Sequence, residues 1–318
     1  MKHQPEIKVS AKNYLEKSIA DFNLMSLKFN LRPLEKIYFG NDEKKGDILR
    51  GGFGGALRSM ACSYKWEDMN CKQCDITDSC FYFMYFETNR PHPYLIRPTL
   101  GSRRFYSVGE ELFFEMILIG EAIQHADKFA KTIEELGRIG VGSKRGRFRI
   151  KETETVNPMS YEEPPYTDQF NSGVVIEFLS PLKLKEKEEG IYYARAPFKT
   201  LFKLLIKRII NLNNLYCNGR NFDKEKIERE KDVLLKQAEK IEMRPFTEWK
   251  DFKRFSSRQQ KWMKIGGQMG LVIYSGDLTP FYSYLKIGEV IGAGQHTTSG
   301  FGRYKIIPSE KCEPKETA

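Results

Sequence analysis

Two glycine-rich, basic segments hold the residue types in this chain that are best suited to binding phosphate. The first reads GSKRGRFRI (142–150) after an Ile-Gly-Val run, and the second reads GQHTTSGFGRYKI (294–306) after an Ile-Gly-Ala run. Glycine lets a ligand approach the main chain closely, and successive backbone N–H groups in such a loop can hold an anion. Both segments add basic or hydroxyl side chains, so a phosphate backbone is the expected ligand.

The repetition of this pattern favours a binding role over the alternative, which is a tight turn with solvated charges. A mononucleotide site is disfavoured, because neither segment ends in the Gly-Lys-Ser/Thr of a phosphate-binding loop. The run GGFGG (51–55) also lacks a following lysine and lies inside a helical pattern. The two loops therefore point to a polymeric anion.

Four of the six cysteines, Cys62, Cys71, Cys74 and Cys80, have the spacing C-x8-C-x2-C-x5-C. A C-x2-C pair places two thiolates on one turn, and two more complete a tetrahedral site. We expect a structural zinc ion, with an iron–sulfur cluster as the second choice and an unmetallated cluster as the remaining alternative. Disulfides are disfavoured in a reducing compartment. No ligand position is left open, so this metal is not expected to be the catalyst.

Composition restricts the class of protein. The 318 residues are enough for two domains, and 40% hydrophobic with 13% aromatic residues indicate a folded chain. The net charge of +10, with a pI near 9.1, favours a polyanionic partner such as nucleic acid. No signal peptide or membrane span is visible, so we expect a cytoplasmic protein without a membrane partner.

Hydrophobic spacing predicts two similar α+β modules. In the first half it predicts β-α-β-β-α-β, with an apolar strand at 112–119 that Glu115 interrupts and a second helix that ends at Gly137. In the second half it predicts a comparable order, in which extended segments at 246–264 and 268–275 are separate. The expected fold is two tandem ferredoxin-like (RRM-like) domains with a Cys-rich metal-binding insertion. We place the domains at 1–156, with the four-Cys insertion at 62–80, and 174–318, joined by a linker at 157–173.

This combination resembles the RAMP superfamily of CRISPR-associated proteins. That superfamily has tandem ferredoxin-like modules and a C-terminal loop G-x-G-x-x-x-x-x-G-x-G, which Gly292, Gly294, Gly300 and Gly302 fit. Three stretches resemble its precursor-crRNA processing endoribonuclease branch: LRGGFGGALR (49–58), WKDFKRFSSRQQKWMKIGGQMG (249–270) and GQHTTSGFGRY (294–304). The resemblance runs from about residue 25 to the last predicted strand.

The resemblance implies an endoribonuclease that cuts CRISPR repeat RNA to make crRNAs without a catalytic metal. The 2′-hydroxyl attacks the neighbouring phosphate, which leaves a 2′,3′-cyclic phosphate and a 5′-hydroxyl. It also implies partnership with CRISPR effector or adaptation proteins, as a monomer or homodimer. Such a reaction needs a base, an acid and a cation near the phosphorane.

His296 is the candidate catalytic histidine, because it stands in the second glycine-rich loop beside three hydroxyls. Several family members carry the general base at the start of the first-domain helix, where this chain has no histidine. Tyr38, Lys44 and Lys45 are the candidates there. That departure keeps open the alternative of a non-catalytic RAMP-type subunit that holds crRNA.

The candidate RNA-binding residues come from both glycine-rich loops and from the KRFSSRQ stretch. They are Lys144, Arg145, Arg147, Arg254, Arg258, Gln259, Thr297, Ser299 and Arg303. A zinc-containing nucleic-acid module of unrelated function is a third interpretation. The matched stretches in both halves disfavour it.

Overall fold

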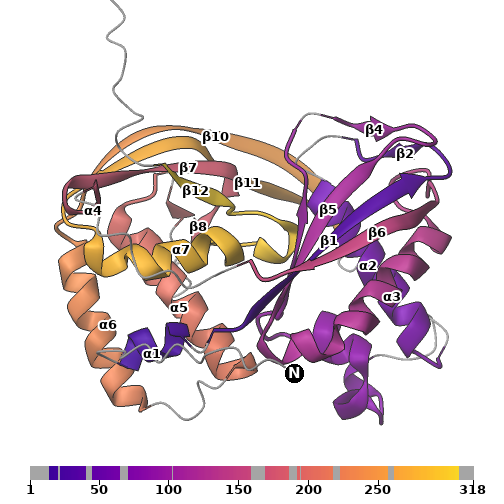
Figure 1. The fold of residues 1–318 in the computed structure, drawn as a ribbon, viewed down its shortest axis with the longest axis horizontal. Helices are drawn as coiled ribbons and strands as arrows, with labels where there is room; N and C mark the ends of the chain where they lie inside the picture. The colour runs from indigo at the N-terminus through magenta and orange to yellow at the C-terminus, as the bar shows by residue number, and fades with distance from the viewer. Residues whose placement is uncertain are drawn as a thin grey trace, which may run out of the picture.

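The computed structural model describes residues 14–20, 22–40, 45–64, 71–101, 103–158, 169–185, 192–193, 195–217, 223–256 and 261–307 (Figure 1). Side chains at 252–256 and 261–264 are not among the features described. Two four-stranded antiparallel sheets form a mixed α+β fold. This confirms the predicted fold class at the level of its layers.

The N-terminal module contains a sheet in the order β3-β5-β1-β6. Its elements are β1 (Leu24–Pro33), α2 (Lys45–Ala61), β3 (Tyr94–Pro98), β5 (Leu112–Ile119), α3 (Ala126–Ile139) and β6 (Phe148–Val156). A two-stranded ribbon of β2 (Ile37–Tyr38) and β4 (Phe105–Tyr106) lies beside it. The 3-10 turn Gly120–His125 leads into α3. The strand order therefore runs second, third, first, fourth along the chain.

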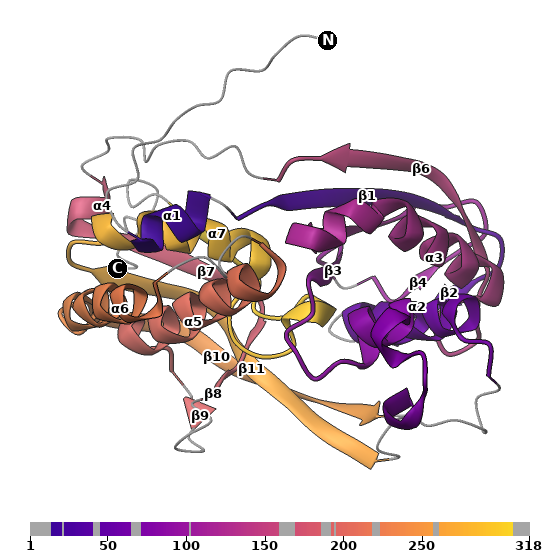
Figure 2. The same cartoon turned by 90° about the horizontal axis from the view of Figure 1, so that it is seen from below.

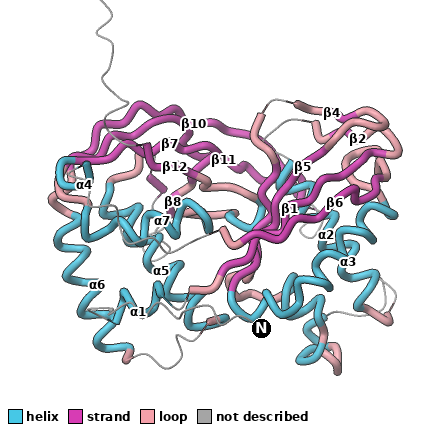
Figure 3. The backbone as a smooth tube through the Cα atoms, viewed as in Figure 1, coloured by secondary structure: helices cyan, strands magenta, loops and turns pink. Residues whose placement is uncertain are grey.

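The C-terminal module repeats this order as β10-β11-β7-β12. Its main elements are β7 (Gly173–Leu182), α5 (Phe198–Tyr216), α6 (Lys224–Ala238), β10 (Glu242–Ser256), β11 (Lys261–Ser275), α7 (Tyr282–Ile291) and β12 (Tyr304–Ile307). The short elements are α4 (Gln169–Ser172), β8 (Leu184–Lys185) and β9 (Tyr192–Tyr193). In both modules the helices lie on one face of the sheet (Figure 3). The repeated phrase in the sequence thus reflects a repeated topology.

The two modules pack against each other through β5. Met116 and Leu118 belong to the core of the N-terminal module, whereas Ile117 and Ile119 belong to the core of the C-terminal module. Successive side chains of a strand point to opposite faces, so this end of β5 is buried on both sides. That explains why all four residues at 116–119 are apolar. The first helix, α1 (Tyr14–Ala20), also packs on the C-terminal module, where Glu230 accepts a hydrogen bond from the Leu15 N–H at 2.8 Å.

Two predicted boundaries are wrong. Helix α3 ends at Ile139 with Gly140 as its C-cap, not at Gly137. Gly137 is needed for packing, since a Cβ there would lie 2.5 Å from the Phe148 carbonyl oxygen. Strands β10 and β11 form one long hairpin, and the predicted break near Gly267 lies inside β11. A Cβ at Gly267 would lie 2.7 Å from the backbone of Leu182, so this glycine allows close strand contact.

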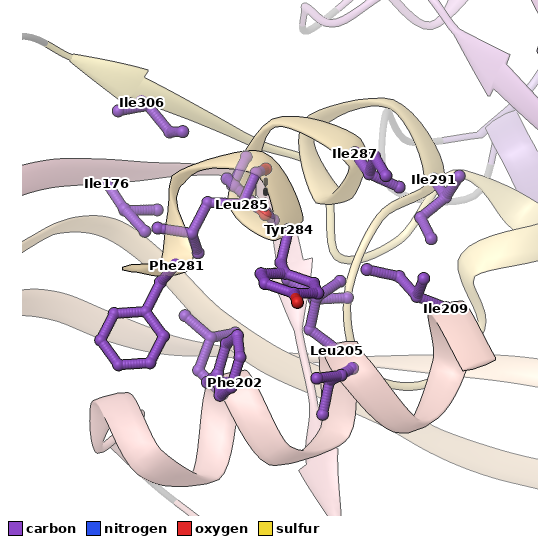
Figure 4. Close-up of a cluster of buried hydrophobic side chains, with 14 of the residues drawn as sticks. Ile176, Phe202, Leu205, Ile209, Phe281, Tyr284, Leu285, Ile287, Ile291 and Ile306 are labelled. Carbon is purple, nitrogen blue, oxygen red and sulfur yellow. Dashed lines mark hydrogen bonds between the residues drawn. The ribbon is translucent and has the colours of Figure 1, made fainter. Parts of the chain in front are cut away.

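Helix α7 is fixed on α5 by a dense apolar cluster (Figure 4). Phe202, Leu205 and Ile209 of α5 face Leu285 and Ile291 of α7, all with essentially no exposed surface. The phenol of Tyr304 reaches the same layer and donates to the Leu285 carbonyl at 2.7 Å. This packing matters for function because α7 leads directly into the second glycine-rich loop. No helix in the described part of the chain is long and apolar enough to cross a membrane.

Candidate active site

The second glycine-rich loop (292–302) has a fixed backbone shape. Gly292, Gly294, Gly300 and Gly302 all have positive φ, between 66° and 78°. These are left-handed conformations that glycine adopts without a steric penalty. The loop is closed by hydrogen bonds from the Ser299 N–H to the His296 carbonyl at 2.9 Å and from the Gly300 N–H to the Thr297 carbonyl at 2.9 Å. The four glycines noted in the sequence are therefore conformational requirements.

His296 occupies the αL region at φ 59° and ψ 23°. Only a few per cent of non-glycine residues have positive φ, and such outliers gather at functional sites. The side chain is half-buried, and its ring meets the Phe301 ring edge-on with centroids 6.0 Å apart. The loop thus holds one imidazole in a defined orientation.

Two arginines hold the end of the helix that precedes the loop. Arg97 of β3 donates to the Glu289 carbonyl at 3.2 Å, and Arg208 of α5 donates to the Ile291 carbonyl at 3.3 Å. Cations are favourable at a helix C-terminus, where carbonyls lack partners. Burial lowers the pKa of Arg208 to about 10, so it stays charged at neutral pH. Charge and hydrogen bonding together set where α7 ends.

The loop docks on the N-terminal module. A Cβ at Gly46, in the first turn of α2, would lie 1.8 Å from the Ser299 carbonyl oxygen. A Cβ at Gly300 would lie 2.8 Å from the Ile96 carbonyl of β3. Arg303 donates to the Pro98 carbonyl at 2.7 Å. The loop therefore lies between the start of α2 and the end of β3, at the junction of the modules (Figures 1 and 2).

Lys45, a predicted catalytic candidate, lies at this junction. It is the first residue of α2, adjacent to Gly46, and only 1% of its surface is exposed. Its Nζ donates to the Gly101 carbonyl at 3.2 Å and lies 5.9 Å from the centre of the Tyr106 ring. A buried ammonium at a helix N-terminus adds positive charge beside the loop. Lys44 falls outside the described residues.

Tyr38, the other predicted base, is associated with the first glycine-rich loop (140–146) rather than the second. Its carbonyl accepts from the Ser143 N–H at 3.2 Å, and a Cβ at Gly142 would lie 2.5 Å from that oxygen. The side chain is 38% exposed. The Gly46–Ser299 contact thus places the start of α2, which begins at Lys45, against the loop that carries His296, whereas Tyr38 contacts the first loop.

The first glycine-rich loop presents its cations to solvent. Lys144, Arg145, Arg147 and Arg149 are all exposed, and Arg145 has a positive φ of 48°. The Arg147 guanidinium donates two hydrogen bonds to the Glu35 carboxylate, at 2.6 and 2.9 Å, and its backbone N–H donates a third at 3.1 Å; these bonds lower the pKa of Glu35. Arg147 is therefore paired with Glu35, whereas Lys144, Arg145 and Arg149 are exposed at the surface.

The other predicted RNA-contacting residues differ in exposure. Thr297 and Ser299 are buried, with 5% and 4% of their surface exposed. Arg303 is half-buried at the module junction, where burial and the Arg97 charge lower its pKa to about 10. The backbone of Arg254 lies in β10, and its side chain is outside the description. Arg258 and Gln259 fall outside the described residues.

Two other histidines occupy structural positions. The His92 Nε2 lies 3.0 Å from Arg50 NH2, so it accepts that N–H, and burial together with the Arg50 and Arg208 charges lowers its pKa to about 4. His125 packs edge-on against Phe81 at 5.4 Å. His3 falls outside the described residues. His296 is thus the histidine that the structure places on a glycine-rich loop.

Sequence reasoning missed the residues that position the site, namely Arg97, Arg208 and Glu115. Glu115 pairs with Arg97 at 3.3 Å and accepts from the Ser26 hydroxyl at 2.6 Å. The interruption of an apolar strand by Glu115 was the one available signal. A charge inside such a strand needs a partner, and here the partner is the arginine that holds α7.

The four clustered cysteines all line one cavity, and all are half-buried and free of disulfides. Within the described residues, no group of three or more His, Cys, Asp or Glu side chains already stands in an arrangement that could hold a metal ion. The predicted metal insertion is therefore not shown, and the metal stays a proposal.

Comparison with known proteins extends this description. The family model of the CRISPR-associated endoribonuclease Cas6 matches residues 176–304. A second family model, described as an N-terminal domain, matches residues 22–172. An uncharacterized protein of Archaeoglobus fulgidus is 23% identical over 279 residues, which cover 82% of this chain and 91% of that protein.

Solved Cas6 structures share the fold. A Cas6 product complex aligns with a TM-score of 0.57 and 11% identity, covering 90% of this chain and 99% of that chain. Thermus thermophilus Cas6 aligns with a TM-score of 0.53 and 10% identity, with the same coverage of 90% and 99%. A chain of a partial Cas6-RT-Cas1–Cas2 complex aligns at 0.52 and 16% identity, covering 90% of this chain and 46% of that chain.

The second half of the chain, residues 176–304, matches the CRISPR-associated Cas6 endoribonuclease family, and the fold over 90% of the chain is that of a solved Cas6 structure.

Proposed function

We propose that this chain is an endoribonuclease that cleaves CRISPR repeat RNA in the precursor transcript, with His296 as a catalytic residue. The observation that carries the proposal is the αL backbone of His296 in a loop docked on the start of α2. That contact brings the loop that carries His296 against the first turn of α2, the helix that begins with the buried Lys45. We also infer that both modules are ferredoxin-like, since each sheet has the same strand order.

The proposed reaction needs no metal. The 2′-oxygen attacks the adjacent phosphorus and loses its proton, the bond from phosphorus to the 5′-oxygen breaks, and the 5′-oxygen gains a proton. The products are a 2′,3′-cyclic phosphate and a 5′-hydroxyl. Histidine suits either proton transfer, because its ordinary pKa is about 6.5. Lys45 and the start of α2 supply positive charge toward the phosphorane.

The exposed cations of the first loop support RNA binding. Lys144 and Arg145 stand on a turn whose N–H groups and charge suit phosphate, Arg149 is exposed at the start of β6, and the KRFSSRQ stretch supplies further cations. CRISPR adaptation proteins are proposed partners, because a solved chain with the same fold belongs to a complex that includes Cas1–Cas2.

The test is cleavage of end-labelled CRISPR-repeat RNA in excess EDTA, with the chemistry of the new 3′ end as the readout. A single cut leaving a cyclic phosphate is the expected result. His125→Asn is the matched control for a substitution of His296, since it removes a histidine that packs among aromatic rings instead of lying on the loop.

A crRNA-holding subunit without activity is the second candidate. The observation that favours it is that the start of α2 presents Lys45, whose Nζ is bound to the Gly101 carbonyl. If the protein binds the repeat RNA tightly but does not cleave it, even when the protein is in large excess over the RNA, this alternative is established and the cleavage proposal is rejected.

A further inference from the structure

The four clustered cysteines lie in the connection that joins α2 to β3. Cys62 directly follows α2, Cys71 begins a short 3-10 helix, and Cys80 follows a second one. These three and Cys74 line a single cavity of about 20 Å³. A cavity lined by four thiols offers the donor set of a tetrahedral four-thiolate ion.

Thr77 already fixes the turns that carry three of the thiols. Its hydroxyl lies 2.9 Å from the Cys71 carbonyl and 2.6 Å from the Cys74 carbonyl, so one proton bridges both acceptors. The Thr77 N–H also donates to the Cys74 carbonyl, and the Cys80 N–H donates to the Thr77 carbonyl, each at 3.3 Å. The backbone of the C-x2-C turn is thus tied to the segment that ends in Cys80.

The surroundings suit a negatively charged centre. Four thiolates around a divalent cation carry a net charge of −2, and the side chain of Arg58 lines the same cavity. Residues around a metal's ligands often supply such compensation. Cys71 and Cys80 also pack against the apolar core of the N-terminal module, which limits access by water.

We propose that Cys62, Cys71, Cys74 and Cys80 bind one zinc ion as four thiolates. Tetrahedral zinc–sulfur bonds of about 2.3 Å require the four sulfurs to approach one another around the ion. The four thiols, all among the described residues, do not stand in that arrangement, so metal binding would draw them together. The ion would tie the far end of α2 to the segment before β3.

This site is independent of the proposed cleavage reaction, although α2 and β3 both contact the second glycine-rich loop. The measurement is metal analysis of the full-length reduced chain after titration with Zn²⁺ and removal of unbound metal, together with its visible absorption spectrum. We expect about one zinc per chain and no visible absorption. The Cys74→Ser variant should lose the zinc, whereas Cys217→Ser, a half-buried thiol outside the cluster, should keep it.

A second measurement uses the unmutated protein, so it does not depend on whether a variant folds. With zinc bound, a thiol reagent should modify Cys217 while the four cluster thiols are protected, and a chelator should remove that protection. Fewer than about 0.1 zinc per chain, bound iron and sulfide with visible absorption, or equal modification with and without zinc would each overturn the proposal.

Discussion

The α-carbon of Gly46 faces the carbonyl oxygen of Ser299 so closely that a β-carbon at position 46 would stand 1.8 Å from that oxygen. The contact joins the first turn of an N-terminal helix to a C-terminal loop. It brings the helix that begins at Lys45 and the loop that carries His296 to the same junction through main-chain packing. Because Gly46 has no side chain, the second glycine-rich loop can pack directly against the first turn of α2.

Gly46→Ala should weaken cleavage, because the added methyl must displace the loop or the helix. Gly51→Ala is the matched control on the same helix, since a Cβ there meets nothing within 4 Å. Alanine is favoured over glycine inside a helix by about 0.5–1 kcal/mol, so the control should be neutral or stabilising. Thermal unfolding and single-turnover cleavage of both variants test this. Equal activity in the two variants would show that the contact does not control the site.

His296→Ala should lower the single-turnover cleavage rate by about 10²–10⁴-fold, the usual contribution of a general acid or base. Repeat-RNA affinity should change little, because the loss is in proton transfer. Rates and dissociation constants are measured on the same preparation. A drop in affinity with an unchanged rate at saturation would assign His296 to binding instead of catalysis.

Replacing Lys144 and Arg145 together by alanine should weaken RNA binding and reduce its salt dependence. Each phosphate contact adds about 0.7 to the slope of log K against log salt for single strands, so two contacts remove about 1.4. Lys224→Ala, on the exposed face of α6, serves as the control. A parallel shift of the binding curve with no change in slope would argue against direct phosphate contacts.

The stability of the fold should fall as the pH is lowered below about 6.5. The pKa of His92 is about 4 in the folded chain and near its ordinary 6.5 when unfolded, so the unfolded chain takes up the proton first. The contribution of His92 is complete above pH 6.5 and is lost as the pH falls toward 4. By pH 5 the resulting loss in the free energy of unfolding is on the order of 1–2 kcal/mol.

His92→Gln removes the titrating ring and should flatten this dependence. Denaturant unfolding of both proteins at pH 7 and pH 5 measures the difference. If the two free energies of unfolding fall by the same amount between these pH values, another group is responsible.

Elements with a strong local signal were predictable. Strand β5 runs from Leu112 to Ile119 as predicted, because a short, mostly apolar run of this length is typical of a buried strand. Local signals failed where a glycine serves tertiary packing, as at Gly137 and Gly267, because the sequence does not distinguish close approach from a turn. For the site, the loop and its glycines were predictable. The roles of Arg97 and Arg208 were not, since they depend on where α7 ends in space.

Arg145 and His296 are the two non-glycine residues with positive φ in the part of the chain described, and each lies in one glycine-rich loop. Each glycine-rich loop thus contains one non-glycine residue with a positive φ, an arginine in the first loop and a histidine in the second. A substitution at such a position can exchange a phosphate-binding cation for a histidine without altering the backbone of the turn.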